Sequence, residues 1–171
     1  MKLPRAPNRI TAAFGFSFVN RAIQEGLGRR KFGKPEMAQV LAFFGQETPH
    51  CVSCGGDDVG RWDHLVPVSE GGETVLGNMV PCCAHCDDSK QHHGYAEWMR
   101  GNPRTCGHGV EERIAKIEAY VQDNGYKVRP LEDRLNRAEA KRLKAIRDRL
   151  TQARTDLEQL IQDYRARTGE G

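Results

Sequence analysis

Apolar residues recur every three or four positions around residues 40 and 115, and both segments are predicted to form helices. The first helix is expected to begin near Pro35, a residue suited to a first helical turn, and to end before Gly45. The second covers residues 110–122 and ends at Asn124 and Gly125. The apolar positions behind these predictions are Met37, Val40, Leu41 and Phe44, and then Val110, Ile114, Ile117 and Val121.

A third and longer helix is predicted from Leu131 to Gly169, because no residue in this segment breaks a helix. At about 1.5 Å per residue it would extend over roughly 55 Å. Its apolar positions alternate between spacings of three and four, a narrow stripe of the coiled-coil type that a helical hairpin or a dimer would bury. The stripe consists of Leu143, Ile146, Leu150, Ala153, Leu157, Leu160 and Tyr164.

Between the first two helices the apolar runs become short, which predicts strands. Residues 65–68 and 79–81 are two such runs, separated by the Gly-rich turn 69–72. The segment from Cys86 to Arg100 contains no turn residue except Gly94 and is predicted to be helical. The predicted order is therefore strand, strand, helix.

Charge is unevenly distributed along the chain. The net charge is only +3, but residues 1–36 carry eight basic and two acidic side chains, and residues 37–109 carry four and nine. We therefore expect a basic N-terminal arm at residues 1–36, a central domain at 37–109 and a helical C-terminal extension at 110–171. The mean hydropathy of −0.67 argues against a single large core.

No apolar run approaches the roughly 20 residues needed to cross a bilayer, and the first residues lack the pattern of a secretion signal. We therefore expect a cytoplasmic protein with no membrane partner. In a reducing compartment, cysteines that are close in sequence are more often metal ligands than disulfides.

Four of the six cysteines fall in two Cys-x-x-Cys pairs, Cys51 with Cys54 and Cys83 with Cys86. Two such turns can close a tetrahedral site around Zn²⁺. Buried free cysteines are the alternative, because free Cys also packs well in a core. A four-sulfur zinc site would be structural and would stabilise a core too small to be held by hydrophobic burial alone.

The segment between and just after these cysteine pairs holds the candidate chemistry. In chain order its residues are Asp63, His64, Asn78, Asp87 and Lys90. Together with the cysteine pairs they resemble the zinc-bearing HNH endonuclease family, which combines Asp-His, a central Asn, and a final His or Asn followed three residues later by Lys. The resemblance covers residues 51–100. It departs from the family's pattern at Asp87, which stands where the family has His or Asn.

The resemblance implies a ββα-metal fold and hydrolysis of phosphodiester bonds. His64 is then the general base, Asp63 and Asp87 bind one Mg²⁺ or Mn²⁺, and Asn78 braces the loop that presents His64. A neutral imidazole can take a proton from water near pH 7, and carboxylates suit these cations. Asp88 is the alternative to Asp87. Because adjacent residues of an ideal strand face opposite sides, Asp63 and His64 require a bulge or a strand end.

An acidic domain needs basic flanks to bind an acidic polymer. The densest basic cluster is Arg29, Arg30, Lys31 and Lys34, and we predict that these residues and Lys90 contact nucleic acid. A second set lies at helical spacing on the long C-terminal helix, where a solvated face is an equally good interpretation. This second set is Arg134, Arg137, Lys141 and Lys144.

Taken together, the sequence predicts an α+β protein with a small zinc-stabilised ββα-metal core, a basic N-terminal arm and a C-terminal helical hairpin or coiled coil. The expected activity is endonucleolytic cleavage of DNA, with RNA left open, and the C-terminal helices could form a homodimer. The main alternative is a catalytically inactive, zinc-stabilised nucleic-acid-binding module. A weaker alternative is a coiled-coil interaction protein that uses the zinc domain as an anchor.

Overall fold

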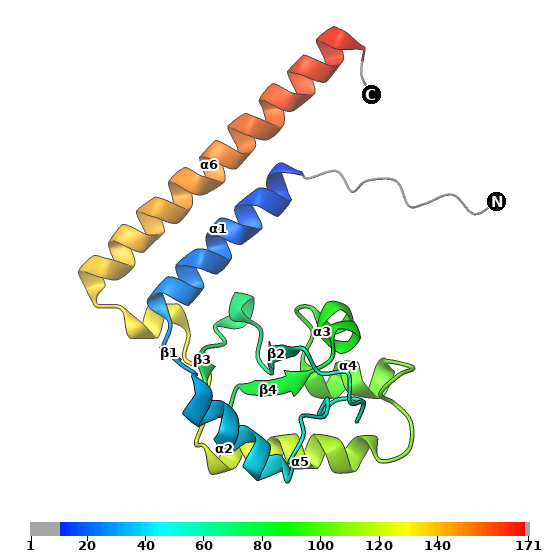
Figure 1. Ribbon diagram of the computed structural model, residues 1–171. Coiled ribbons are helices and arrows are strands. Elements are labelled where there is room, and N and C mark those ends of the chain that lie inside the picture. Colours follow the sequence, from blue (N-terminus) through cyan, green and yellow to red (C-terminus); the bar gives the residue numbers. More distant parts are fainter. Residues whose placement is uncertain (1–10, 170–171) are drawn as a thin grey trace, which may run out of the picture. The chain divides into compact units, whose positions relative to one another are not determined.

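The computed structural model describes residues 11–169, and the chain divides into two compact units (Figure 1). The core unit is Gln24–Arg134 and includes both cysteine pairs. The helical unit joins the N-terminal residues up to Ile23 to Leu135–Gly171. The predicted division at residues 36 and 109 follows charge rather than packing, and it stays a prediction.

A two-stranded sheet and a short helix form the centre of the core unit. β2 (Arg61–His64) pairs antiparallel with β4 (Met79–Cys82), and Asp63 lies opposite Val80. α3 (Ala84–Lys90) follows β4 directly and contacts β2 (Figure 1). This is the strand, strand, helix order that the sequence predicted, and the predicted fold class is confirmed.

The first predicted strand was placed wrongly, because the strand lies at Arg61–His64 rather than at residues 65–68. Beyond His64 the backbone of Val66 bonds to the side-chain amide of Asn78 instead of to a neighbouring strand. The chain then turns through the 3-10 helix Val68–Glu70. The apolar run is buried because it forms a tied loop over the core, a state that a hydrophobic run alone does not distinguish from a strand.

Three helices pack around this sheet, namely α2 (Lys34–Phe44), α4 (Tyr95–Gly101) and α5 (Val110–Asp123). Both α2 and α5 lie where they were predicted, and each is followed by a glycine with positive φ, Gly45 and Gly125. Their inner residues form one cluster with the cysteines. Its most deeply buried members include Val40, Met99, Ile114, Ile117 and Tyr120.

The single helix predicted from Cys86 to Arg100 is instead two helices, α3 and α4. The break follows Lys90, where Gln91 adopts a positive φ of 50° that a continuing helix does not allow. Gly94 then precedes the first turn of α4 in an extended conformation.

A second, parallel pair of strands joins the basic segment to the core unit. β1 (Arg30–Lys31) pairs with β3 (Thr74–Val75), with Arg30 beside Thr74. The amide of Thr74 donates a 3.2 Å hydrogen bond to the carbonyl of Arg29. Part of the predicted arm is therefore an ordered strand of the core unit.

The helical unit contains most of α1 (Ala12–Leu27) and all of α6 (Arg137–Thr168). α6 begins six residues later than predicted, after the 3-10 turn Leu131–Arg134, because Asn136 caps its first turn. The Asn136 side chain accepts hydrogen bonds from two backbone amides, and Glu139 bonds back to the Asn136 amide, which forms a capping box.

Along the predicted apolar stripe of α6 only Leu143 is buried, and its other large side chains are exposed or half-buried. The exposed ones are Ile146, Leu157, Leu160 and Tyr164. The coiled coil therefore stays a prediction. Within residues 11–169, no helix is long and apolar enough to cross a membrane.

Candidate nuclease site and metal centre

The four cysteines of the two pairs come together in the core unit. Their Sγ atoms all lie within 4.8 Å of one another, and those of Cys54 and Cys83 are 3.9 Å apart. Four sulfurs around one Zn²⁺ at about 2.3 Å lie roughly 3.8 Å from each other, so the donor set and its spacing fit zinc. Three of the four are buried, and Cys54 is half-buried. The predicted metal-binding cluster is confirmed, with Cys83 rather than Cys82 as its third member.

Cys82 supports the cluster from outside. Its thiol lies 4.0 Å from the Sγ of Cys51 and donates to it, which lowers the pKa of Cys51 to about 4. Burial and the charge on Cys51 act in the opposite direction and raise the pKa of Cys86. A divalent cation offsets both effects, because it stabilises the thiolate form of every ligand.

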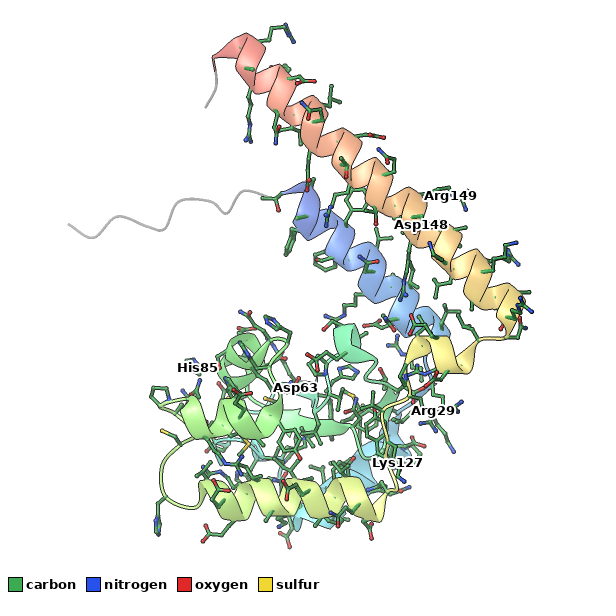
Figure 2. All side chains as sticks on the ribbon, turned by 180° about the vertical axis from the view of Figure 1, so that it is seen from behind. Arg29, Asp63, His85, Lys127, Asp148 and Arg149 are labelled. Atoms are coloured by element: carbon green, nitrogen blue, oxygen red, sulfur yellow. The ribbon has the colours of Figure 1, made fainter. Side chains whose placement is uncertain are left out.

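Asp63 and His64 occupy the end of β2. Asp63 is buried inside the core unit, whereas His85 of α3 is exposed (Figure 2). His64 is half-buried and is the last residue of the strand, so the strand end expected from the sequence is present. The Nε2 atom of His64 lies 3.0 Å from the hydroxyl of Thr74, which arrives from β3.

Lys90 is fully buried beside these two residues. Its ammonium lies 3.1 Å from Oδ2 of Asp63 and donates a 2.7 Å hydrogen bond to the carbonyl of His64. The predicted contact of Lys90 with nucleic acid is therefore not where the structure places this side chain, which is only 2% exposed. Lys90 ties α3 to β2 instead. Burial raises the pKa of Asp63, and the nearby Lys90 ammonium offsets part of that increase.

Asp87 lies in the first turn of α3, near Asp63. Its negative charge contributes to the raised pKa of Asp63, so the two carboxylates are close enough to interact. Arg61 donates from one nitrogen to both Asp87, at 2.9 Å, and Asp88, at 2.5 Å. Hard oxygen ligands of this type suit Mg²⁺ or Mn²⁺. Sequence reasoning missed Arg61, although its place two residues before Asp63 puts both on one face of β2.

Asn78 connects the loop after His64 to β4. Its side-chain oxygen accepts a 2.8 Å hydrogen bond from the Val66 amide, and its side-chain nitrogen donates to the carbonyls of Val66 and Glu73. Asn78 is completely buried. Its amide thus satisfies backbone groups that would otherwise be buried without partners.

Residues 51–93 match the family model described as HNH endonuclease. This segment is an HNH domain. The family recognised from the sequence is thereby confirmed, together with its cysteine-rich type. No curated protein and no solved structure matches the chain.

The HNH domain depends on one glycine of its central turn. A Cβ atom at Gly72 would lie 1.8 Å from the carbonyl oxygen of Val66, so no other residue fits the close approach of these two loop segments. The Gly72 amide also donates to the carbonyl of Pro67. The Gly-rich turn predicted from the sequence thus packs against the residues that follow His64.

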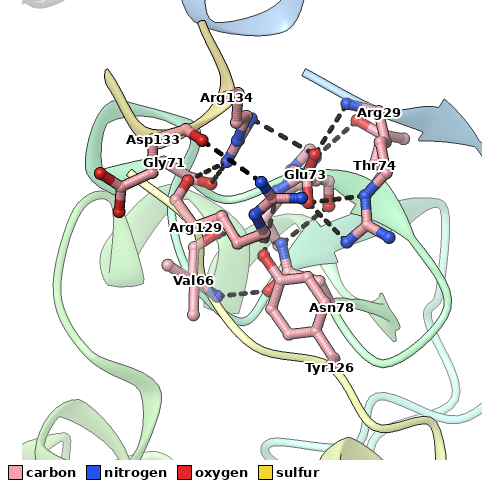
Figure 3. Close-up of polar contacts among 11 residues, drawn as sticks. Arg29, Val66, Gly71, Glu73, Thr74, Asn78, Tyr126, Arg129, Asp133 and Arg134 are labelled. Carbon is pink, nitrogen blue, oxygen red and sulfur yellow. Dashed lines mark hydrogen bonds and ion pairs between the residues drawn. The ribbon is translucent and has the colours of Figure 1, made fainter. Parts of the chain in front are cut away.

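The residue after this glycine, Glu73, is the centre of a network that sequence reasoning missed (Figure 3). Its carboxylate is 1% exposed and lies 2.7 Å from the guanidinium of Arg29 and 3.3 Å from that of Arg134. Its amide donates to the hydroxyl of Tyr126. Burial alone would raise the pKa of Glu73, but the bonds to Arg29 and the charge of Arg134 outweigh it and lower the pKa.

The predicted nucleic-acid contacts in the basic segment differ in their surroundings. Arg29 is paired with Glu73, although its side chain is still 61% exposed. Arg30, Lys31 and Lys34 are exposed. Of the four, these three have the surface position that a phosphate contact requires.

Proposed function

We propose that the protein is a metal-dependent endonuclease that hydrolyses phosphodiester bonds in DNA. The observation that carries this proposal is the grouping of three residues inside the HNH domain. His64 ends β2, Asp63 precedes it, and Asp87 acts electrostatically on Asp63 from α3.

In this mechanism His64 accepts the proton of the attacking water. The water oxygen forms a bond to phosphorus, and the bond from phosphorus to the 3′ oxygen breaks, which leaves a 5′-phosphate and a 3′-hydroxyl. Asp63 and Asp87 would hold the divalent cation, and the bound cation neutralises charge on the phosphate and on the leaving oxygen. Lys90 keeps Asp63 in place beside His64.

The basic residues outside the acidic site supply the attraction for DNA in this proposal. Arg30, Lys31 and Lys34 would contact phosphates, and α6 carries further basic residues in its first half. The exposed apolar residues of α6 support a homodimer, which would bring two sites to the two strands. The four-thiol zinc site supports a reducing, cytoplasmic location.

One observation favours the second candidate, an inactive nucleic-acid-binding module. The guanidinium of Arg61 is bonded to Asp87 and Asp88, so a cation of the protein itself already neutralises a proposed metal ligand. If this pair persists when DNA is bound, no divalent cation can use Asp87.

Incubation of the zinc-loaded protein with supercoiled plasmid and Mg²⁺ or Mn²⁺ separates the two functions. A nuclease should nick the plasmid, and end mapping should find 5′-phosphates. His64→Ala should keep its zinc and its fold but cut about a hundredfold more slowly or less, as expected for the loss of a general base. His108→Ala, which changes another exposed histidine, should cut at the wild-type rate.

An intact plasmid with normal DNA binding would identify the inactive module. A His64→Ala variant that cuts normally would remove His64 from the mechanism. Asp87→Ala and Asp88→Ala should be compared in the same assay over a range of Mn²⁺ concentrations. Only Asp87→Ala should need more Mn²⁺.

A further inference from the structure

The geometry points to Thr74 as a positioning residue that orients His64, with the buried Glu73 as its anchor. This inference rests on the proposed function, because it assigns His64 the role of the base. The Thr74 hydroxyl lies 3.0 Å from Nε2 of His64. Nothing in the HNH motif as it stands in this sequence calls attention to Thr74, which comes ten residues after His64 on another strand.

A histidine that acts as a base needs one nitrogen with a lone pair and a ring held in one orientation. When the hydroxyl of Thr74 accepts a hydrogen bond from Nε2–H, the proton of the neutral ring is fixed on Nε2 and the lone pair lies on Nδ1. A base whose orientation is set by a third group is a recurring arrangement in catalytic sites. Thr74 provides this group without contacting the water or the phosphate.

The backbone around Thr74 is held firmly enough to define where its hydroxyl lies. The Thr74 amide donates to the carbonyl of Arg29 across the β1–β3 pair. On the preceding residue, Glu73, the amide donates to Tyr126 and the carbonyl accepts from Asn78. Every one of these bonds comes from a different part of the core unit.

The charge network at Glu73 completes the anchor. Its carboxylate accepts hydrogen bonds from the Arg29 amide at 2.8 Å and from the Arg29 guanidinium at 2.7 and 3.0 Å, and Arg134 pairs with it from the other side. Arg134 also donates to the carbonyls of Gly71 and Arg129. Two guanidinium groups therefore fix the turn that ends in Thr74, and Arg29 acts through that turn.

Two substitutions of Thr74 test the inference in the zinc-loaded, full-length protein. Thr74→Val keeps the shape of the side chain and removes the hydroxyl, whereas Thr74→Ser keeps the hydroxyl. Thr74→Val should lower kcat for plasmid nicking about tenfold to a hundredfold with little change in KM, and Thr74→Ser should restore most of it. The matched control is Thr48→Val, since the exposed Thr48 hydroxyl lies 3.5 Å from Nε2 of His50, and it should leave kcat unchanged.

The second measurement is the ¹⁵N NMR spectrum of the His64 ring, recorded at a pH where the ring is neutral. The wild-type protein and Thr74→Ser should show one tautomer protonated at Nε2, and Thr74→Val should show a mixture of two. A merely structural role for Thr74 would change stability without this shift. The measurement needs no substrate, so it stands even if the nuclease proposal fails.

Each outcome decides one question. Lower kcat and mixed tautomers in Thr74→Val, both restored in Thr74→Ser, support the inference. Unchanged His64 signals in a folded Thr74→Val variant overturn it, whatever the cleavage rate. If the wild-type protein cuts no plasmid, the proposed function is refuted, and the His64 signals alone then decide whether Thr74 orients this ring.

Discussion

The hydroxyl of Tyr120 bridges the two residues that flank Asn78, and its removal gives a sharp test of the packing described above. It accepts a 2.9 Å hydrogen bond from the Gly77 amide and donates a 3.0 Å hydrogen bond to the Met79 carbonyl. Tyr120 is 1% exposed, so neither group can turn to water in its place. Tyr120→Phe keeps the ring and removes only this bridge.

At neutral pH the cost should be about 2 kcal/mol, because a buried backbone group that loses its partner costs roughly 1–3 kcal/mol. For a unit of this size that lowers Tm by on the order of 8 °C. The measurement is urea denaturation of wild-type protein and variant at about pH 8, followed by circular dichroism.

Alkaline pH adds a second, independent signature. Burial raises the pKa of Tyr120 to about 12, whereas a tyrosine in the unfolded chain ionises near about 10. Since the folded pKa is the higher one, the stabilisation is complete below about pH 10 and is lost as the pH rises to about 12. The total loss is about 2.7 kcal/mol, and roughly half of it should be gone at about pH 11.

Tyr120→Phe has no hydroxyl to ionise, so the stability gap between the two proteins should narrow by about 1.4 kcal/mol between pH 8 and 11. Other groups titrate in both proteins and cancel in the difference. Tyr164→Phe, at an exposed position on α6, should leave stability unchanged at both values. A gap that stays constant with pH would show that the Tyr120 hydroxyl is not held as described.

Two further predictions concern the metal centre and the basic segment. Cys86→Ser should lose zinc and leave the core unit unfolded, as measured by metal analysis and circular dichroism, because metal binding and folding are coupled; a folded, zinc-loaded variant would contradict a four-thiolate site. Changing Arg30, Lys31 and Lys34 together to Gln should flatten the plot of log affinity against log salt by roughly 0.9 for each phosphate that the variant no longer binds, whereas Arg29→Gln should lower kcat and leave that slope unchanged. The reverse result would make Arg29 a DNA-binding residue rather than a partner of Glu73.

Sequence patterns located the features that depend on neighbours close in the chain. The two Cys-x-x-Cys turns, the ends of α2 and α5 and the strand–strand–helix order all follow from spacing within a few residues. The HNH resemblance also identified Asn78 as the residue whose amide ties the loop after His64. Such features need only local geometry, and a single sequence contains it.

The features missed depend on charge pairs between distant parts of the chain. Glu73 was interpreted as one acidic residue in a turn, because nothing local shows that Arg29, 44 residues earlier, will neutralise it. Lys90 was expected at the surface for the opposite reason, since lysine is seldom buried without a partner. Its partner, Asp63, lies on another element, and only folding brings the two together.

The boundaries of the core unit have a practical consequence for dissecting this protein. The matched segment 51–93 carries all the motif residues, but it excludes Arg29 and Arg134, the two cations that neutralise Glu73, and the whole of α5. Excised at those limits, the segment would expose a bare carboxylate and the inner face of its own core. The smallest portable cassette for grafting or expression is therefore Gln24–Arg134, more than twice the length that the motif suggests.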